Sequence, residues 1–94
     1  MTDQPKIISG DVSAPRNALT EGRRAWERRE YRDSLVAVSY DDPATPGRER
    51  VLVWDRKAGI RAGYLWFRGH STDAAVEAFR AGERSAPGLL QTSA

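Results

Sequence analysis

Apolar and polar residues alternate along three short stretches in the middle of the chain. Residues 34–40 read SLVAVSY, residues 50–56 read RVLVWDR and residues 63–68 read GYLWFR. Alternation with a period of two, carried by β-branched and aromatic side chains, is typical of strands with at least one face in a core. The pattern therefore predicts three strands, with tryptophan and valine on opposite faces of the second.

The segments between these strands contain residues that end strands. Residues 41–49 include two prolines and a glycine, and residues 55–63 include Gly59 and Gly63. Connections this short join antiparallel neighbours, whereas parallel strands need a longer crossover. The three strands are therefore predicted to form an antiparallel meander.

A helix is predicted near the C-terminal end of the chain. Ser71 or Thr72 can cap its first turn, Asp73 suits the helix dipole there, and Gly82 can end it in the left-handed conformation. A helix of about ten residues is marginal alone in water, so its apolar face must pack against the sheet. That face is formed by Ala75, Val76 and Phe79.

The N-terminal third shows weaker patterns. Residues 1–16 contain two prolines and a glycine without apolar periodicity, which predicts a flexible arm, and residues 85–94 are predicted to form a flexible tail. Residues 17–25 favour a helix. Residues 26–32 suit a helix or an extended segment equally.

These elements predict one small α+β domain over residues 17–84. It would be an antiparallel meander of three to four strands with the C-terminal helix packed on it, and a short N-terminal helix is an option. One helix covers only one face of such a sheet, and the other face would be too apolar for a monomer. Either the N-terminal segment, led by Trp26, covers it, or a second copy or another protein does. The residues predicted on this face are Leu52, Trp54, Tyr64 and Trp66.

Composition bounds the class of protein. The 94 residues include 15 Lys and Arg against 13 Asp and Glu, so the formal net charge is only +2, and there is no cysteine to form a disulfide or a thiolate zinc site. The opening residues lack the pattern of a signal peptide, and no stretch has the length of a membrane span. We therefore expect a cytoplasmic protein without a membrane partner. A core this small also favours self-association.

Residues with catalytic or metal-binding chemistry are few. His70 stands beside Ser71 and near Asp73, but neighbours at the start of a helix diverge and do not form a nucleophile, base and orienting group. Asp41 and Asp42 lie next to two prolines and are typical of a turn. We expect no enzyme, no catalytic or metal-ligating residues and no cofactor.

Residues 16–32 hold six arginines and three glutamates. Arginine contacts phosphate and stacks on bases, so direct binding of nucleic acid is an alternative function for this segment. The glutamates interrupt the basic face that a nucleic-acid footprint requires, which favours a solvated or partner-binding surface instead. The residues of the nucleic-acid alternative are Arg23, Arg24, Arg28, Arg29 and Arg32.

Tryptophan, tyrosine and arginine are enriched at the energetic centres of protein interfaces. Several of these residues stand in or beside the predicted sheet, and we expect Trp26 and Tyr31 to anchor the opening stretch against it. The candidates for contact with a partner are Trp26, Arg28, Tyr31, Trp54, Tyr64 and Trp66.

Short motifs follow one another in a defined order over residues 26–83. They are W-x-R-x-x-Y at 26–31, V-x-V at 36–38, V-x-V-x-D-x-K at 51–57, G-x-L-x-F at 63–67 and RAGE at 80–83. This order resembles the BldB-like family of small actinobacterial proteins, which are often encoded beside helix-turn-helix regulators. The resemblance implies a cytoplasmic, non-enzymatic regulatory protein that acts through protein contacts. It further implies a homodimer that modulates a helix-turn-helix transcription regulator in development or secondary metabolism.

Overall fold

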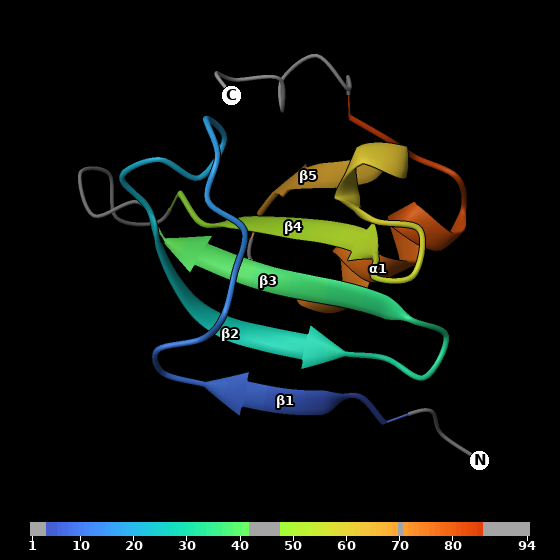
Figure 1. Cartoon of the computed structure of the whole chain (residues 1–94), viewed down its shortest axis with the longest axis horizontal. Coiled ribbons are helices and arrows are strands. Elements are labelled where there is room, and N and C mark those ends of the chain that lie inside the picture. The colour runs from blue at the N-terminus through green and yellow to red at the C-terminus, as the bar shows by residue number, and fades with distance from the viewer. Residues whose placement is uncertain (1–3, 42–47, 70, 86–94) are drawn as a thin grey trace.

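Strand pairing dominates the architecture of the chain. The computed structural model describes residues 4–41, 48–69 and 71–85. Within these ranges the five strands form one antiparallel sheet in sequence order, from β1 at one edge to β5 at the other (Figure 1). The α+β class and the meander are confirmed, but the sheet has five strands rather than three to four. The elements are β1 (Lys6–Ser9), β2 (Arg24–Glu30), β3 (Leu35–Asp41), β4 (Arg50–Asp55), the 3-10 helix η1 (Ile60–Ala62), β5 (Tyr64–Arg68) and α1 (Thr72–Arg80).

The three strands with the clearest alternation are confirmed. β3, β4 and β5 begin and end within one residue of the predicted stretches. Their register places Val53 opposite both Ala37 and Leu65, and these three side chains belong to one hydrophobic cluster. The neighbouring residues along each strand point to the other face, as a period of two requires.

The predicted helix over residues 17–25 is wrong. Turns occupy residues 18–22, and β2 begins at Arg24 and runs through the segment that suited either conformation. β2 pairs with β3 on one side and β1 on the other, so that Arg28 lies opposite both Val38 and Ile8. This pairing outweighs a local helical preference, which a short segment with a weak apolar stripe cannot sustain.

Part of the predicted flexible arm is a strand. Residues 6–9 form β1, whose four positions pair with residues 27–30 of β2. The N–H of Gly10 also donates to the carbonyl of Trp26, at 3.1 Å, and extends this pairing by one residue. A strand of four residues carries too little alternation to be read from the sequence. The predicted tail lies outside the described residues except for Ser85.

The predicted C-terminal helix is confirmed. The side-chain oxygen of Ser71 accepts the N–H of Ala74 at 3.1 Å, which is an N-cap. At the other end, Gly82 has a φ of 101°, and its N–H donates to the carbonyl of Phe79 while the N–H of Glu83 donates to that of Ala78. These two bonds are the Schellman arrangement, and the positive φ favours glycine.

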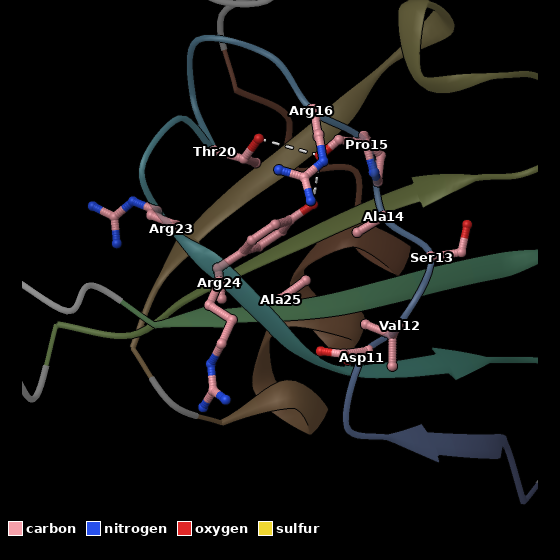
Figure 2. A pocket seen from close by; sticks show the side chains of 11 residues that line it. Asp11, Val12, Ser13, Ala14, Pro15, Arg16, Thr20, Arg23, Arg24 and Ala25 are labelled. Carbon is pink, nitrogen blue, oxygen red and sulfur yellow. Dashed lines mark hydrogen bonds between the residues drawn. The ribbon is translucent and has the colours of Figure 1, made fainter.

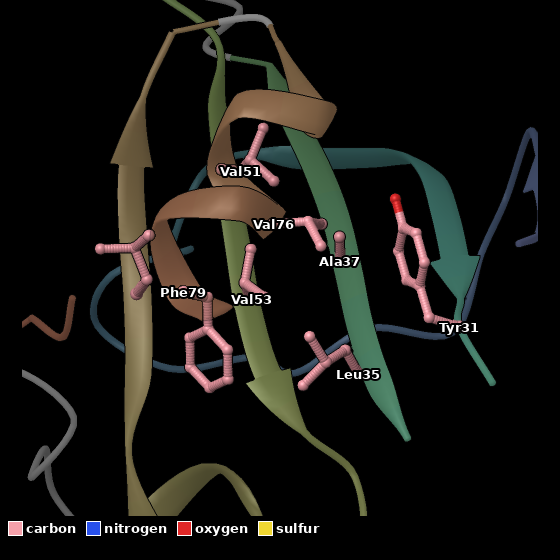
Figure 3. Close-up of a cluster of buried hydrophobic side chains, with 9 residues drawn as sticks. Tyr31, Leu35, Ala37, Val51, Val53, Val76 and Phe79 are labelled. Atoms are coloured by element: carbon pink, nitrogen blue, oxygen red, sulfur yellow. The ribbon is translucent and has the colours of Figure 1, made fainter. Parts of the chain in front are cut away.

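α1 covers one face of the sheet (Figure 3). Its buried residues Ala75, Val76 and Phe79 pack against side chains from three strands and the β2–β3 turn. Polar contacts flank this core, since the hydroxyls of Ser39 and Thr72 lie 3.3 Å apart and both are buried. The sheet residues of this helix-side core are Tyr31, Leu35, Ala37, Val51, Val53 and Leu65.

A segment of the N-terminal region covers the opposite face. Residues 10–23, here called the strap, connect β1 to β2 in the sequence and cross one face of the sheet (Figure 1). Apolar strap side chains pack on a second buried cluster, so the sheet has a core on each side. The strap residues are Val12, Ala14 and Leu19, and the cluster consists of Val36, Val38, Tyr40, Leu52, Trp54 and Tyr64.

Candidate binding surface

Two side chains of the sheet hold the strap in place. Arg28 donates from Nη1 to the carbonyl of Ser13 at 2.9 Å, and Tyr40 donates its hydroxyl to the carbonyl of Pro15 at 3.0 Å. Thr20, which is buried, donates its hydroxyl to the same carbonyl at 3.2 Å and so closes a loop over residues 15–20. These bonds satisfy backbone carbonyls on an otherwise irregular segment. They therefore fix the path of the strap over the face of the sheet that carries Trp54, Tyr64 and Trp66, here called the aromatic face.

The strap settles how the aromatic face is covered. Trp54 and Tyr64 are 7% and 1% exposed, so the chain itself buries them, and Trp26 does not lead the covering segment. Trp26 is half-buried in β2 and belongs to neither hydrophobic cluster. Tyr31 is buried in the helix-side core. Of the aromatic candidates from the sequence, only Trp26 and Trp66 retain substantial exposed surface.

The strap and the sheet enclose a cleft of about 380 Å³. Tyr40 lines it, and burial raises the pKa of this tyrosine above its ordinary value, which keeps the hydroxyl a donor to Pro15. The arginine side chains at the rim diverge, since Arg23 and Arg24 point away from each other and from Arg16 (Figure 2). The three arginines therefore do not converge on a common point in the cleft.

Replacing Tyr40 by phenylalanine is expected to lower the free energy of unfolding by about 1 kcal/mol near neutral pH, because one buried hydrogen bond to the strap is lost. It should also flatten the loss of stability at alkaline pH. The unfolded chain releases the tyrosine proton near pH 10, whereas the folded protein with its raised pKa retains it, so rising pH favours unfolding. Urea unfolding at pH 7 and at about pH 10.5, which is just above the ordinary pKa of tyrosine, measures both effects.

Tyr31→Phe is the matched control. The Tyr31 hydroxyl is buried without a hydrogen bond to the described residues, so its removal should change stability near neutral pH by little or increase it. An equal decrease in the free energy of unfolding of the two variants at pH 7 would contradict a stabilising hydrogen bond between Tyr40 and the strap.

The arginines of β2 do not form a single basic face. Strand alternation sends Arg28 to the strap side and Arg29 to the helix side. Nε of Arg28 lies 2.8 Å from a Glu30 carboxylate oxygen, and Nε of Arg29 lies 2.8 Å from one of Glu27. Both arginines therefore serve intramolecular ion pairs, while Arg32 is exposed in the β2–β3 turn, away from the start of β2.

A different group of arginines gathers at one end of the sheet, where β2 and β4 begin and β3 and β5 end. The sheet register places Arg50 directly opposite both Tyr40 and Arg68. Arg23 donates to the carbonyl of Arg48 at 3.2 Å, and Arg24 lies 3.3 Å from Asp41. This group, here called the arginine end, consists of Arg23, Arg24, Arg48, Arg50 and Arg68.

Trp66 lies at the centre of the arginine end. The guanidinium carbons of Arg23 and Arg50 are 5.6 and 6.0 Å from the centroid of its ring. Tyr40 meets the same ring edge-on, with centroids 5.7 Å apart. Both arginine distances lie within cation–π range, so the indole is held by its neighbours while it stays half-buried at the surface.

Sequence reasoning found Arg23, Arg24 and Trp66 but not their association. Arg48, Arg50 and Arg68 were not candidates, because they are scattered among the strand ends. The signal available in the sequence was an arginine at an end of each of β2, β4 and β5. Only the register of the sheet shows that these ends coincide.

The remaining candidate residues that the structure describes make structural contacts. Ser71 is the helix cap, Asp73 lies 3.4 Å from Arg29, and Asp41 pairs with Arg24. His70 and Asp42 lie outside the described residues. Within residues 4–41, 48–69 and 71–85, no three histidine, aspartate or glutamate residues are grouped to hold a metal ion.

Comparisons with protein families, curated proteins and solved structures find no match to this chain. Within the described ranges, no helix has the length and apolar character that a bilayer crossing requires. The arginine end is therefore interpreted from its own geometry.

Proposed function

We propose that this chain is a non-enzymatic regulatory module that binds a partner protein through the arginine end. The observation that carries the proposal is Trp66, half-buried at the surface between Arg23 and Arg50. Tryptophan and arginine are the residues most enriched at the energetic centres of interfaces, and a ring held in place loses little entropy on binding.

The two covered faces of the sheet support this location. α1 buries one face and the strap buries the other, so the stable core needs no partner on either side. What the sheet still offers is its ends and its edges. Among the ends, the arginine end combines an aromatic side chain with several cations, and it suits an acidic protein surface.

The resemblance to BldB-like proteins supports a helix-turn-helix transcription regulator as the partner, acting in development or secondary metabolism within the cytoplasm. Self-association as a homodimer belongs to the same proposal. The strap covers the aromatic face, so a second copy would have to bind elsewhere. A better candidate is the outer edge of β1, where Ile7 is 51% exposed and its backbone groups face away from β2.

Direct binding of nucleic acid is the second candidate function. Arg23 and Arg24 lie at the arginine end, where Trp66 offers a ring for stacking on a base. Arg28 and Arg29 lie on opposite faces and in ion pairs, so a footprint would use Arg48 and Arg68 in their place. Salt separates the two functions, because binding through phosphate contacts weakens steeply as salt rises.

The test is capture of partners from a lysate of the source cells after nuclease treatment, with the wild-type chain and with Trp66→Ala. We expect a protein partner that stays bound after nuclease with the wild type. With the variant, its affinity should fall roughly thirtyfold, which corresponds to the loss of one interface centre of about 2 kcal/mol. Purified components in a calorimeter would give this ratio.

Arg61→Gln is the control for this experiment. Arg61 is exposed in η1, which precedes β5 and so lies at the other end of the sheet from Arg68. The variant should bind as the wild type does, and circular dichroism should show that Trp66→Ala is folded. A partner that binds folded Trp66→Ala with unchanged affinity would contradict the proposal. Loss of the captured partners after nuclease treatment would instead support the direct binding of nucleic acid.

A further inference from the structure

The outer edge of β5 carries backbone groups that point away from the sheet. The N–H of Gly69 donates inward to the carbonyl of Glu49, at 3.2 Å. Backbone groups alternate in direction along an antiparallel strand, so those of Phe67 also point inward, and those of Trp66 and Arg68 point outward. β5 is an edge strand, and no described strand pairs with this side.

Ser85 already bonds to one part of this edge. Its N–H donates to the carbonyl of Tyr64 at 2.8 Å, and its hydroxyl oxygen accepts the N–H of Trp66 at 2.7 Å. These bonds show that the edge is accessible to another segment of chain. Past Ser85, the carbonyl of Trp66 and the N–H of Arg68 make no hydrogen bond with any described residue.

The side chains next to this edge select a charge. Arg68 is exposed, and its guanidinium makes no ion pair with a described residue. It stands directly opposite Arg50 on β4. An acidic side chain on a strand added beside Arg68 would lie next to its guanidinium and pair with it. The charge complementarity therefore favours an acidic segment over a neutral or basic one.

The alternation of β5 also sets the pattern of the added segment. Trp66 and Arg68 face the strap side, whereas Phe67 is half-buried and packs against the helix-side core. A strand beside β5 would therefore place acidic residues next to Arg68 and apolar residues next to Phe67. We propose that the outer edge of β5 binds an extended, alternating acidic and apolar segment of a partner protein as a sixth strand. This inference rests on the proposed function and names the chemistry of its partner.

The probe is a short blocked peptide of alternating glutamate and valine, titrated into the isotope-labelled full chain at low salt and followed by NMR. The Arg68 N–H of the free chain should exchange rapidly with deuterium, because it makes no hydrogen bond with a described residue. Saturating peptide should slow this exchange about tenfold or more, as formation of a ladder hydrogen bond does. The same peptide with lysine in place of glutamate should bind at least roughly fivefold more weakly.

Two substitutions at Arg68 separate its charge from its backbone donor. Arg68→Gln keeps the N–H and should weaken peptide binding about two- to fivefold, through loss of one exposed charge contact. Arg68→Pro also removes the N–H and should weaken binding by roughly a further two- to tenfold. Proline is tolerated where the N–H of an edge strand faces solvent, so this variant should fold. Arg61→Gln should bind the peptide as the wild type does.

Several results would overturn the inference. Slow exchange of the Arg68 N–H in the free chain would mean that this chain already occupies the edge, and light scattering would show whether a second copy does so. Equal binding by Arg68→Gln and Arg68→Pro would exclude a strand addition at this donor. Binding of oligothymidine in place of the peptide, with a steep dependence on salt, would assign the arginine end to nucleic acid.

The failure of this inference is distinguishable from that of the proposed function. A partner captured after nuclease that is lost with Trp66→Ala but retained with Arg68→Pro would support the regulatory module and reject the sixth strand. A partner lost with both variants and retained with Arg61→Gln supports both proposals.

Discussion

Replacing Trp54 by alanine is expected to lower the free energy of unfolding by about 3–5 kcal/mol. A domain of this size has a total stability of about 5–10 kcal/mol, so the variant should be only marginally folded at room temperature. Urea unfolding of the wild type and the variant, followed by circular dichroism, measures the difference.

The size of this effect follows from what covers the ring. Trp54 is 7% exposed, and it lies opposite Tyr64 and Val36 in the cluster under the strap. The guanidinium carbon of Arg28 is 5.8 Å from the ring centroid, and the same arginine bonds to the strap. Alanine would remove the ring from between the sheet and the strap, and the remaining side chains cannot close the cavity without moving both.

Trp26→Ala is the matched control. The sequence suggested that Trp26 anchors the opening stretch, but its ring is half-buried and lies in neither hydrophobic cluster. We expect a loss of about 1–2 kcal/mol, because part of the ring is already in water. A larger loss for Trp26→Ala than for Trp54→Ala would contradict the arrangement of the strap-side core.

Replacing Phe79 by alanine is expected to lower the free energy of unfolding by a similar amount, about 3–5 kcal/mol. Phe79 is 5% exposed and is the largest side chain that α1 contributes to the helix-side core. The guanidinium carbon of Arg84 lies 3.6 Å from its ring centroid, and Nη1 of Arg84 donates to the Phe79 carbonyl at 2.8 Å. Loss of the ring therefore weakens both the helix contact and the segment that leads to Ser85.

The Phe79→Ala experiment has its control on the same helix. Glu77 is exposed, so Glu77→Ala should change stability by less than about 0.5 kcal/mol in thermal or urea unfolding. If Phe79→Ala lost less than about 1 kcal/mol, the packing of α1 on the sheet would be contradicted, because a short helix does not persist without its buried face.

The elements that could be predicted are those whose patterns are local. β3, β4 and β5 carry alternating apolar residues over five to seven positions, and their connecting turns are short. α1 carries a capping serine, an apolar face and a glycine at its end. Each of these signals lies within the element itself, so neighbouring residues along the chain are sufficient to identify it.

β1 and β2 could not be recognised in this way. β2 reads RAWERRE, a sequence in which charged residues occupy most positions of a strand that is paired on both sides. Arg28 and Arg29 are accepted there because Glu30 and Glu27 neutralise them at 2.8 Å and because β1 and β3 satisfy the backbone of β2. These partners are set by the folded arrangement and not by local preference.

The candidate surface shows the same division. Trp66, Arg23 and Arg24 were recognisable as residue types that suit an interface. Arg50 and Arg68 join them through the sheet register, and Arg48 joins them through the hydrogen bond that Arg23 donates to its carbonyl. The burial of Trp54 and Tyr64 depends on the strap, a segment without periodicity that two side chains of the sheet hold across it.

The sequence by itself determined the α+β class, the three-stranded centre of the meander and the capped C-terminal helix, because hydrophobic period and turn chemistry act over short distances along the chain. The tertiary structure alone decided the two further strands, the strap that covers the second face and the gathering of arginines around Trp66. Those features depend on hydrogen bonds and packing between residues far apart in sequence, whose pairing becomes defined only when the whole sheet assembles.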